Sequence, residues 1–348
     1  PITIGLATAV VPLQLGAQSI VFPRLCSLGF WTWFIGGCTL VLSYVVDGGP
    51  GGAEPQAREL WVAALGMVVV GLLIGVVVLA ATVLGARAPG MGLIDTPFFS
   101  LSVLVASVIW IVSLAALLAS TVLGFLLTTY ESSILGLPLL GGAEEAWILV
   151  SWFADKPQIL SLLIVGLGVG TDVIASVSGV APRARGVMFG SIAAFGIFTF
   201  GAWSQTALYP ELADDAWAIV AAFAVGVPLL IVLGGWFDIV RRGTPSTRGP
   251  ILAIVTFVVL ALGALTSGEL TAIEVLDLFG TSAISAAYGF AIAGGIAAAI
   301  AALTWWSSKI WGRVLNPALV QGAALLVLLG GLLVGLPELI SGFLDQPD

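Results

Sequence analysis

The sequence of 348 residues is 59% hydrophobic and 9% charged, with a mean hydropathy of +1.16 and a net charge of −8. Soluble domains carry about 25% charged residues, so this composition excludes a water-soluble domain. We therefore expect an integral membrane protein, with no nucleic acid among its partners.

Apolar runs of about 20 residues, the length that crosses a hydrocarbon core as an α-helix, recur along the chain. They lie at 29–46, 60–85, 100–128, 146–171, 186–208, 216–237, 250–266, 282–306 and 316–337. Residues 1–15 form the apolar end of a further helix, so the pattern predicts nine full spans and one partial span. Such lengths favour helices over barrel strands, which are shorter and alternate apolar with polar residues. We expect an all-α polytopic bundle, a single membrane domain over residues 1–348 that is partial at both termini.

Basic residues fall in alternate segments between the predicted spans. Nine of the eleven lie on one face: Arg24, Arg87, Arg183, Arg185, Arg241, Arg242, Arg248, Lys309 and Arg313. The positive-inside rule makes this face cytoplasmic, and the acidic loops then lie outside. We expect a multi-pass protein of the bacterial cytoplasmic (inner) membrane.

Several short stretches carry a specific resemblance to one family. They are 11–17 (VPLQLGA), 22–24 (FPR), 87–91 (RAPGM), 152–160 (WFADKPQIL), 312–315 (GRVL) and 336–338 (LPE). On these stretches the chain resembles subunit I of the haem-copper oxidases, from late in that subunit's second helix to the loop after its eleventh. The resemblance implies the same helical bundle and, as activity, the reduction of oxygen at haem and copper.

The resemblance also implies metals held by histidine, yet the sequence contains no histidine. At the family's copper-ligand positions stand Lys156, Ser204 and Gln205, and at its tenth-helix haem-ligand positions stand Ala287 and Gly289. The family's proton-passing glutamate is replaced by Gln158. We therefore expect a degenerate member with no cofactor, no metal site and no catalytic residue.

Lys156 is unusual because a charge within an apolar helix is costly and marks a site or a pairing. Three interpretations stay open: a neutralised or Asp155-paired structural plug, a substrate, ion or proton site in a water-filled cavity, or a metal ligand. The candidates to line the cavity are Asp155, Lys156, Gln158, Ser204 and Gln205. The space of the lost haems requires that helices close in, that bulky residues such as Phe290 fill it, or that lipid or quinone occupies it.

Three functions follow as hypotheses. The first is a non-catalytic, cofactor-free structural or assembly subunit of a larger membrane complex of the respiratory chain, with partners like oxidase subunits II and III. On this hypothesis the chain is not an enzyme by itself. The second is a transporter or channel that reuses the empty haem cavity. The third is subunit I of a terminal cytochrome c oxidase, which the family implies.

Overall fold

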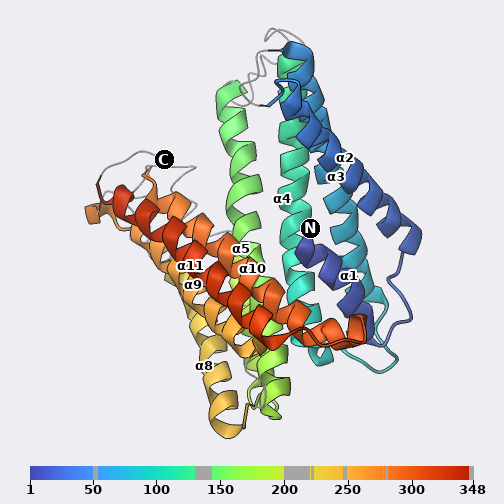
Figure 1. Ribbon diagram of the computed structural model, residues 1–348, viewed down its shortest axis with the longest axis vertical. Helices are drawn as coiled ribbons and strands as arrows, with labels where there is room; N and C mark the ends of the chain where they lie inside the picture. Colours follow the sequence, from blue (N-terminus) through green and yellow to red (C-terminus); the bar gives the residue numbers. More distant parts are fainter. Residues whose placement is uncertain are drawn as a thin grey trace.

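The computed structural model describes residues 1–49, 54–129, 143–199, 223–245, 249–276 and 281–344, together with Val220 and Leu278. Its regular elements are helices (Figure 1), which confirms the all-α fold class. They are α1 (Ile2–Leu15), α2 (Pro23–Val45), α3 (Pro55–Gly85), η1 (Leu93–Asp95), α4 (Phe98–Thr129), α5 (Ala143–Ser178), α6 (Arg185–Phe198), α8 (Gly226–Arg242), α9 (Gly249–Thr271), η4 (Glu274–Leu276), α10 (Ala283–Ile310) and α11 (Pro317–Gly342).

Within the described part of the chain, seven helices are long and apolar enough to cross a membrane, so the protein is a multi-pass membrane protein. These spans are 23–45, 56–85, 98–123, 158–178, 249–271, 283–310 and 317–342. The helices α1 and α6 are apolar but shorter, and the predicted span 186–208 continues beyond the described residues. The count of nine full spans and one partial span therefore stays a prediction.

Helix starts differ from the apolar runs because the chain marks them with proline. Helix α2 begins at Pro23, several residues before the apolar run, and α11 begins at Pro317 behind the N-cap Asn316. Proline suits the first helical position because it has no N–H to leave unpaired there. The side chain of Asn316 accepts a hydrogen bond from the Ala318 N–H at 3.0 Å, so this helix end is also capped.

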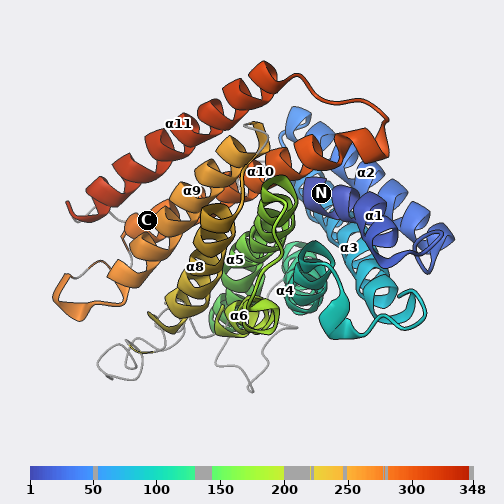
Figure 2. The same ribbon diagram turned by 90° about the horizontal axis from the view of Figure 1, so that it is seen from below.

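Helix α5 lies between two groups of helices (Figure 2). One group runs α1 to α4, where α2 packs on α3 and α3 on α4; the other holds α8 to α11, where α9, α10 and α11 pack on one another. Helix α5 contacts α4 on one side and α8, α9 and α10 on the other. It therefore joins the two groups.

Glycines on α5 permit these close contacts. A Cβ atom at Gly166 would collide with the ring of Phe257 on α9, and one at Gly170 would collide with the indole of Trp236 on α8. Neighbouring helices can approach a glycine surface more closely than any other. The packing of α5 therefore depends on the absence of side chains at these positions.

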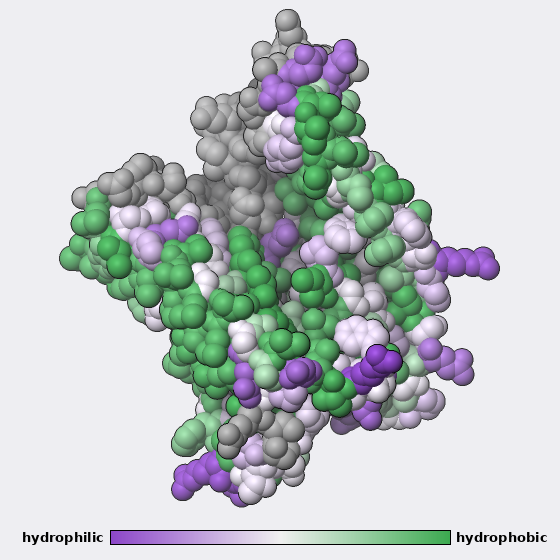
Figure 3. Space-filling model, in the orientation of Figure 1, coloured by the Kyte–Doolittle hydropathy of each residue, from purple (hydrophilic) through white to green (hydrophobic). Residues whose placement is uncertain are grey.

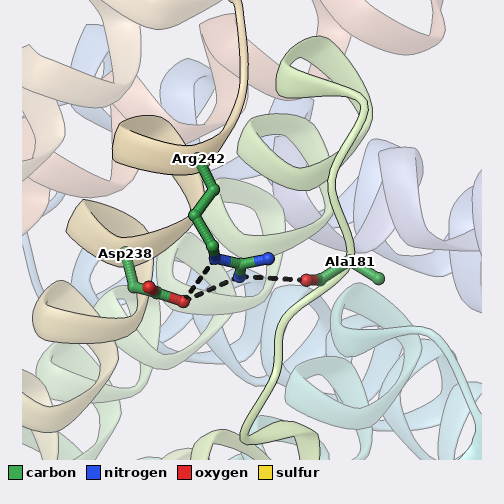
Figure 4. Close-up of polar contacts among 3 residues, drawn as sticks. All are labelled: Ala181, Asp238 and Arg242. Carbon is green, nitrogen blue, oxygen red and sulfur yellow. Dashed lines mark hydrogen bonds and ion pairs between the residues drawn. The ribbon is translucent and has the colours of Figure 1, made fainter.

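Polar contacts tie the loops at one end of the bundle. The Arg185 guanidinium donates to the carbonyls of Ile94 (3.2 Å) and Thr96 (2.6 Å). Arg242 donates to the carboxylate of Asp238 at 2.7 and 2.9 Å and to the Ala181 carbonyl at 3.2 Å (Figure 4).

Hydrophobic residues cover much of the molecular face in Figure 3 and hydrophilic residues gather towards its ends, as expected for a bundle that crosses a bilayer.

Candidate functional site

Most side chains of the predicted copper-site region are not described. Four of its five polar side chains are not described: Asp155, Lys156, Ser204 and Gln205. Gln158 on α5 is half-buried, and its backbone carbonyl accepts hydrogen bonds from the Trp110 indole N–H (3.4 Å) and from the Ser161 hydroxyl. The three interpretations of Lys156 therefore stay predictions.

The predicted haem-ligand positions both lie on α10 and meet neighbouring helices. Ala287 is fully buried. A Cβ atom added at Gly289 would lie 3.4 Å from Val334 Cγ1 and 3.6 Å from Glu338 Oε2, both on α11. These are ordinary van der Waals distances, so α11 packs directly over the Gly289 position.

The ring of Phe290, the residue after Gly289 on α10, packs between α9 and α11. This residue is 3% exposed. A Cβ atom at Gly263 on α9 would lie 3.2 Å from the ring, and one at Gly335 on α11 would collide with it. The ring thus sits between two glycines on different helices, and the α9–α10–α11 contact is packed as tightly as a protein interior. Of the three expectations for this region, helix closure and filling by a bulky side chain both describe the packing around Phe290.

The residues at the two predicted haem-ligand positions do not fit a haem or a copper ion. Haem iron is held by His, Cys, Met or Tyr, and Ala287 and Gly289 offer no such group. No group of three or more His, Cys, Asp or Glu residues suited to a metal ion occurs among the described residues. Helix α11 lies against Gly289, one of the two positions that the resemblance assigns to haem.

A buried carboxylate organises the end of the bundle that also holds the Arg185 contacts. Asp172 on α5 accepts hydrogen bonds from the backbone N–H groups of Phe98 and Phe99, each at 3.0 Å. Gln14 on α1 donates its amide to Asp172 Oδ2 at 2.9 Å, and Gln14 Oε1 accepts from the N–H (3.2 Å) and hydroxyl (2.7 Å) of Ser100. These contacts satisfy the first N–H groups of α4, which have no partner within the helix.

The neighbours of Asp172 extend this polar cluster to α6 and α8. The Trp236 indole N–H of α8 donates to Thr171 Oγ1 at 2.8 Å. The Arg185 guanidinium of α6 lies 4.8 Å from the centre of the Phe98 ring. One small region therefore links α1, α4, α5, α6 and α8. Its signal in sequence was Gln14, which lies in the stretch 11–17 that carried part of the family resemblance.

Comparison with known proteins matches the whole chain to one family. The family model described as "Cytochrome C and Quinol oxidase polypeptide I" matches residues 1–348. The cytochrome c oxidase subunit 1 of Bacillus subtilis is 26% identical over all of this chain and 58% of the relative, and the quinol oxidase subunit 1 of the same organism is 24% identical over all of this chain and 56% of the relative. The haem-copper oxidase subunit I+III of Aeropyrum pernix is 25% identical over all of this chain and 44% of the relative. The chain spans about half the length of these curated relatives.

The names of these relatives contradict the expectation of a cofactor-free structural or assembly subunit. Each relative is named as an oxidase subunit, and no observation on the described residues supports a structural role in place of that function. The expectation was wrong because it inferred a change of function from the replacement of ligand positions alone. The transporter alternative rested on a polar cavity whose lining falls largely outside the described residues, and the matched names give it no support.

Proposed function

Since the chain belongs to the cytochrome c and quinol oxidase polypeptide I family, we propose that it is the polypeptide I component of a membrane-bound terminal oxidase. The family match over residues 1–348 carries this proposal. The helical bundle supports it, because seven described helices suit a membrane and α5 contacts α4 on one side and α8, α9 and α10 on the other.

The electron donor in this proposal is cytochrome c or a quinol. Relatives of both kinds match all of this chain at similar identity, 26% and 24%. Their names support an activity in which one of these donors is oxidised while oxygen is consumed. No electron or proton step is assigned to Ala287 or Gly289, because neither side chain can ligate a metal or titrate.

The proposed location is the bacterial cytoplasmic membrane, with the basic end of the bundle inside. Arg87, Arg185 and Arg242 all take part in hydrogen bonds at the loop end of the bundle that also holds residues 94–96, and basic ends face the cytoplasm. The proposed partners are membrane subunits of the II and III type. A relative whose name joins subunits I and III in one chain supports the second of these.

A purification from native membranes tests the proposal. The protein carries an affinity tag at its natural locus, and the purified complex is supplied with reduced cytochrome c or with a quinol in an oxygen electrode. We expect the complex purified on the affinity resin to consume oxygen with one of the two donors. We also expect it to contain further membrane subunits. A complex that retains its other subunits and consumes no oxygen with either donor would contradict the proposal. Untagged membranes taken through the same resin control for carry-over.

A further inference from the structure

Helices α10 and α11 touch over several turns through glycines of α11. A Cβ atom at Gly342 would lie 2.9 Å from the Cβ of Ala283, and one at Gly331 would lie 3.0 Å from the Cβ of Ala293. The ring of Phe290 packs against α11 between these two levels. Small residues let membrane helices approach closely, and these contacts leave no gap between α10 and α11 for a flat macrocycle.

The side chains of this sequence that can bind haem iron are few. Haem iron is held by His, Cys, Met or Tyr, and the sequence has no histidine, two cysteines, three methionines and four tyrosines. Cys26 and Cys38 both belong to α2, where about 18 Å of helix separates them. Met188 is 2% exposed on α6, and a Cβ atom at Gly235 of α8 would collide with its sulfur, so its thioether is already packed.

The side chains suited to copper are equally scarce. Proteins hold copper with imidazole, thiolate or thioether groups, and a copper centre needs several of them at one place. The positions that the resemblance assigns to copper carry an amine, a hydroxyl and an amide, at Lys156, Ser204 and Gln205. The described part of the chain also offers no group of three or more His, Cys, Asp or Glu residues suited to a metal ion.

We propose that the haem and copper ligands of the oxidase complex lie outside residues 1–348, and that α11 packs against α10 at Gly289 in that complex. The inference rests on the proposed function, because relatives named as haem-copper oxidase supply the expectation of these metals. Imidazole is the commonest metal ligand in proteins, so the expected ligands are histidines of the complex that do not belong to residues 1–348.

Histidine-selective labelling tests the first part of this proposal, because residues 1–348 contribute no histidine to the labelled pool. The complex is purified through a tag free of histidine from a histidine-requiring strain that is supplied with ¹⁴N- or ¹⁵N-histidine. Pulsed EPR then records the nitrogen couplings of the haem iron and the copper ion. We expect both metals to show ¹⁵N couplings after labelling. Couplings that the label leaves unchanged would overturn the proposal, since the ligands would not be histidines.

Two conservative variants test the remaining candidates within the chain. Tyr288→Phe, next to both predicted haem-ligand positions on α10, and Met188→Leu on α6 each remove a group of a type that binds haem iron. We expect the haem spectrum and the haem content of the complex to be the same as without the substitution. A shifted haem spectrum at an unchanged melting temperature, in either variant, would place an iron ligand in residues 1–348 and overturn the proposal.

Cysteine cross-linking tests the contact between α10 and α11 in the assembled complex. A Cβ atom at Gly289 would lie 3.4 Å from Val334 Cγ1, so Gly289→Cys with Val334→Cys should form a disulfide under mild oxidation. Gly289→Cys with Leu333→Cys is the matched control, because Leu333 is the preceding residue of α11 and is 75% exposed. Both pairs are made with Cys26→Ser and Cys38→Ser. Equal cross-linking of the two pairs, or none in either, would contradict the contact.

Failure of this inference differs from failure of the proposed function. A complex that contains no haem and consumes no oxygen would contradict the proposed function and remove the premise of the inference. A complex that consumes oxygen and whose metals show no histidine couplings would contradict the inference alone.

Discussion

Gln14 on α1 and Asp172 on α5 are joined by a hydrogen bond of 2.9 Å across 158 residues of sequence. Both Asp172 oxygens and the Gln14 amide oxygen accept from three consecutive residues at the start of α4, so two side chains complete one helix terminus. A carboxylate at a helix N-terminus is favourable because the terminus carries partial positive charge. The finding identifies a residue pair on which the joint of α1, α4 and α5 depends.

Replacing Asp172 by Asn tests this joint. The amide group has one accepting oxygen, so its NH₂ group must face either a backbone N–H or the Gln14 amide, both of which are donors. We expect the free energy of unfolding to fall by about 1.5–3 kcal/mol, as for the loss of a hydrogen bond to a charged group. The measurement is thermal unfolding of the purified protein in detergent. The control is Asp238→Asn, where the lost ion pair is partly exposed and should lower the melting temperature less than Asp172→Asn does; equal effects would argue against the joint.

The Asp238–Arg242 pair of Figure 4 predicts a pH dependence. The hydrogen bond from Arg242 lowers the pKa of Asp238 below its ordinary value of 3.8, and Asp238 lies one residue beyond the predicted span 216–237. Because the folded pKa is lowered, the pair stabilises the folded chain at pH above 3.8, and this contribution is lost as pH falls through the folded pKa. Arg242→Gln should raise the pKa of Asp238, which a titration followed by ¹³C NMR of labelled aspartate measures. An unchanged pKa would contradict the prediction.

A matched pair of glycines on α11 tests the packing around Phe290. In Gly335→Ala the new methyl group collides with the Phe290 ring, whereas in Gly330→Ala the methyl group meets no atom within 4 Å. We expect Gly335→Ala to lower the melting temperature, because overpacking costs about 1–3 kcal/mol. Gly330→Ala should leave it unchanged or raise it, since alanine restricts the unfolded chain. Indistinguishable melting temperatures would show that the ring moves away freely.

The double variant Gly335→Ala with Phe290→Leu provides a second test of the same contact. Removing the ring relieves the collision, so the two substitutions should be less destabilising together than the sum of their separate effects. Thermal unfolding of the four members of this cycle measures the coupling. Strict additivity would place the cost of Gly335→Ala elsewhere than in the Phe290 ring.

Gly168 on α5 should be the least tolerant of the tested glycines. A Cβ atom there would collide with Ser102 and lie 2.6 Å from the Phe98 carbonyl oxygen, and a backbone atom cannot rotate away. We expect Gly168→Ala to reduce the yield of folded protein in membranes. Gly190→Ala on α6, where a Cβ atom meets nothing within 4 Å, is the control. Size-exclusion profiles of the fluorescently tagged variants compare the two, and a normal profile for Gly168→Ala would contradict the packing.

Sequence patterns were sufficient for the all-α fold class, for the multi-pass membrane character and for the family, because apolar length and short motifs are local properties. They could not supply the partners of Asp172, since Gln14 is distant in sequence and only the packing of α1 on α4 brings it close. They left a bulky side chain such as Phe290 as one of three ways to fill the space of the lost haems, and they did not predict the two glycines that receive the Phe290 ring. Of the predicted site residues, Ala287, Gly289 and Gln158 are placed, while Lys156 and its proposed neighbours stay predictions.

The glycines of α5 also fix how the two helix groups can move. Positions 166 and 170 are separated by one helical turn and meet aromatic rings of α9 and α8, whereas position 168 faces the α4 backbone on the opposite side. Rotation of α5 about its axis would bring a side chain into one of these contacts, and sliding by one residue would do the same. The glycines at positions 166, 168 and 170 thus set the axial register between the two helix groups. Each carries only a hydrogen atom where another residue would carry a side chain.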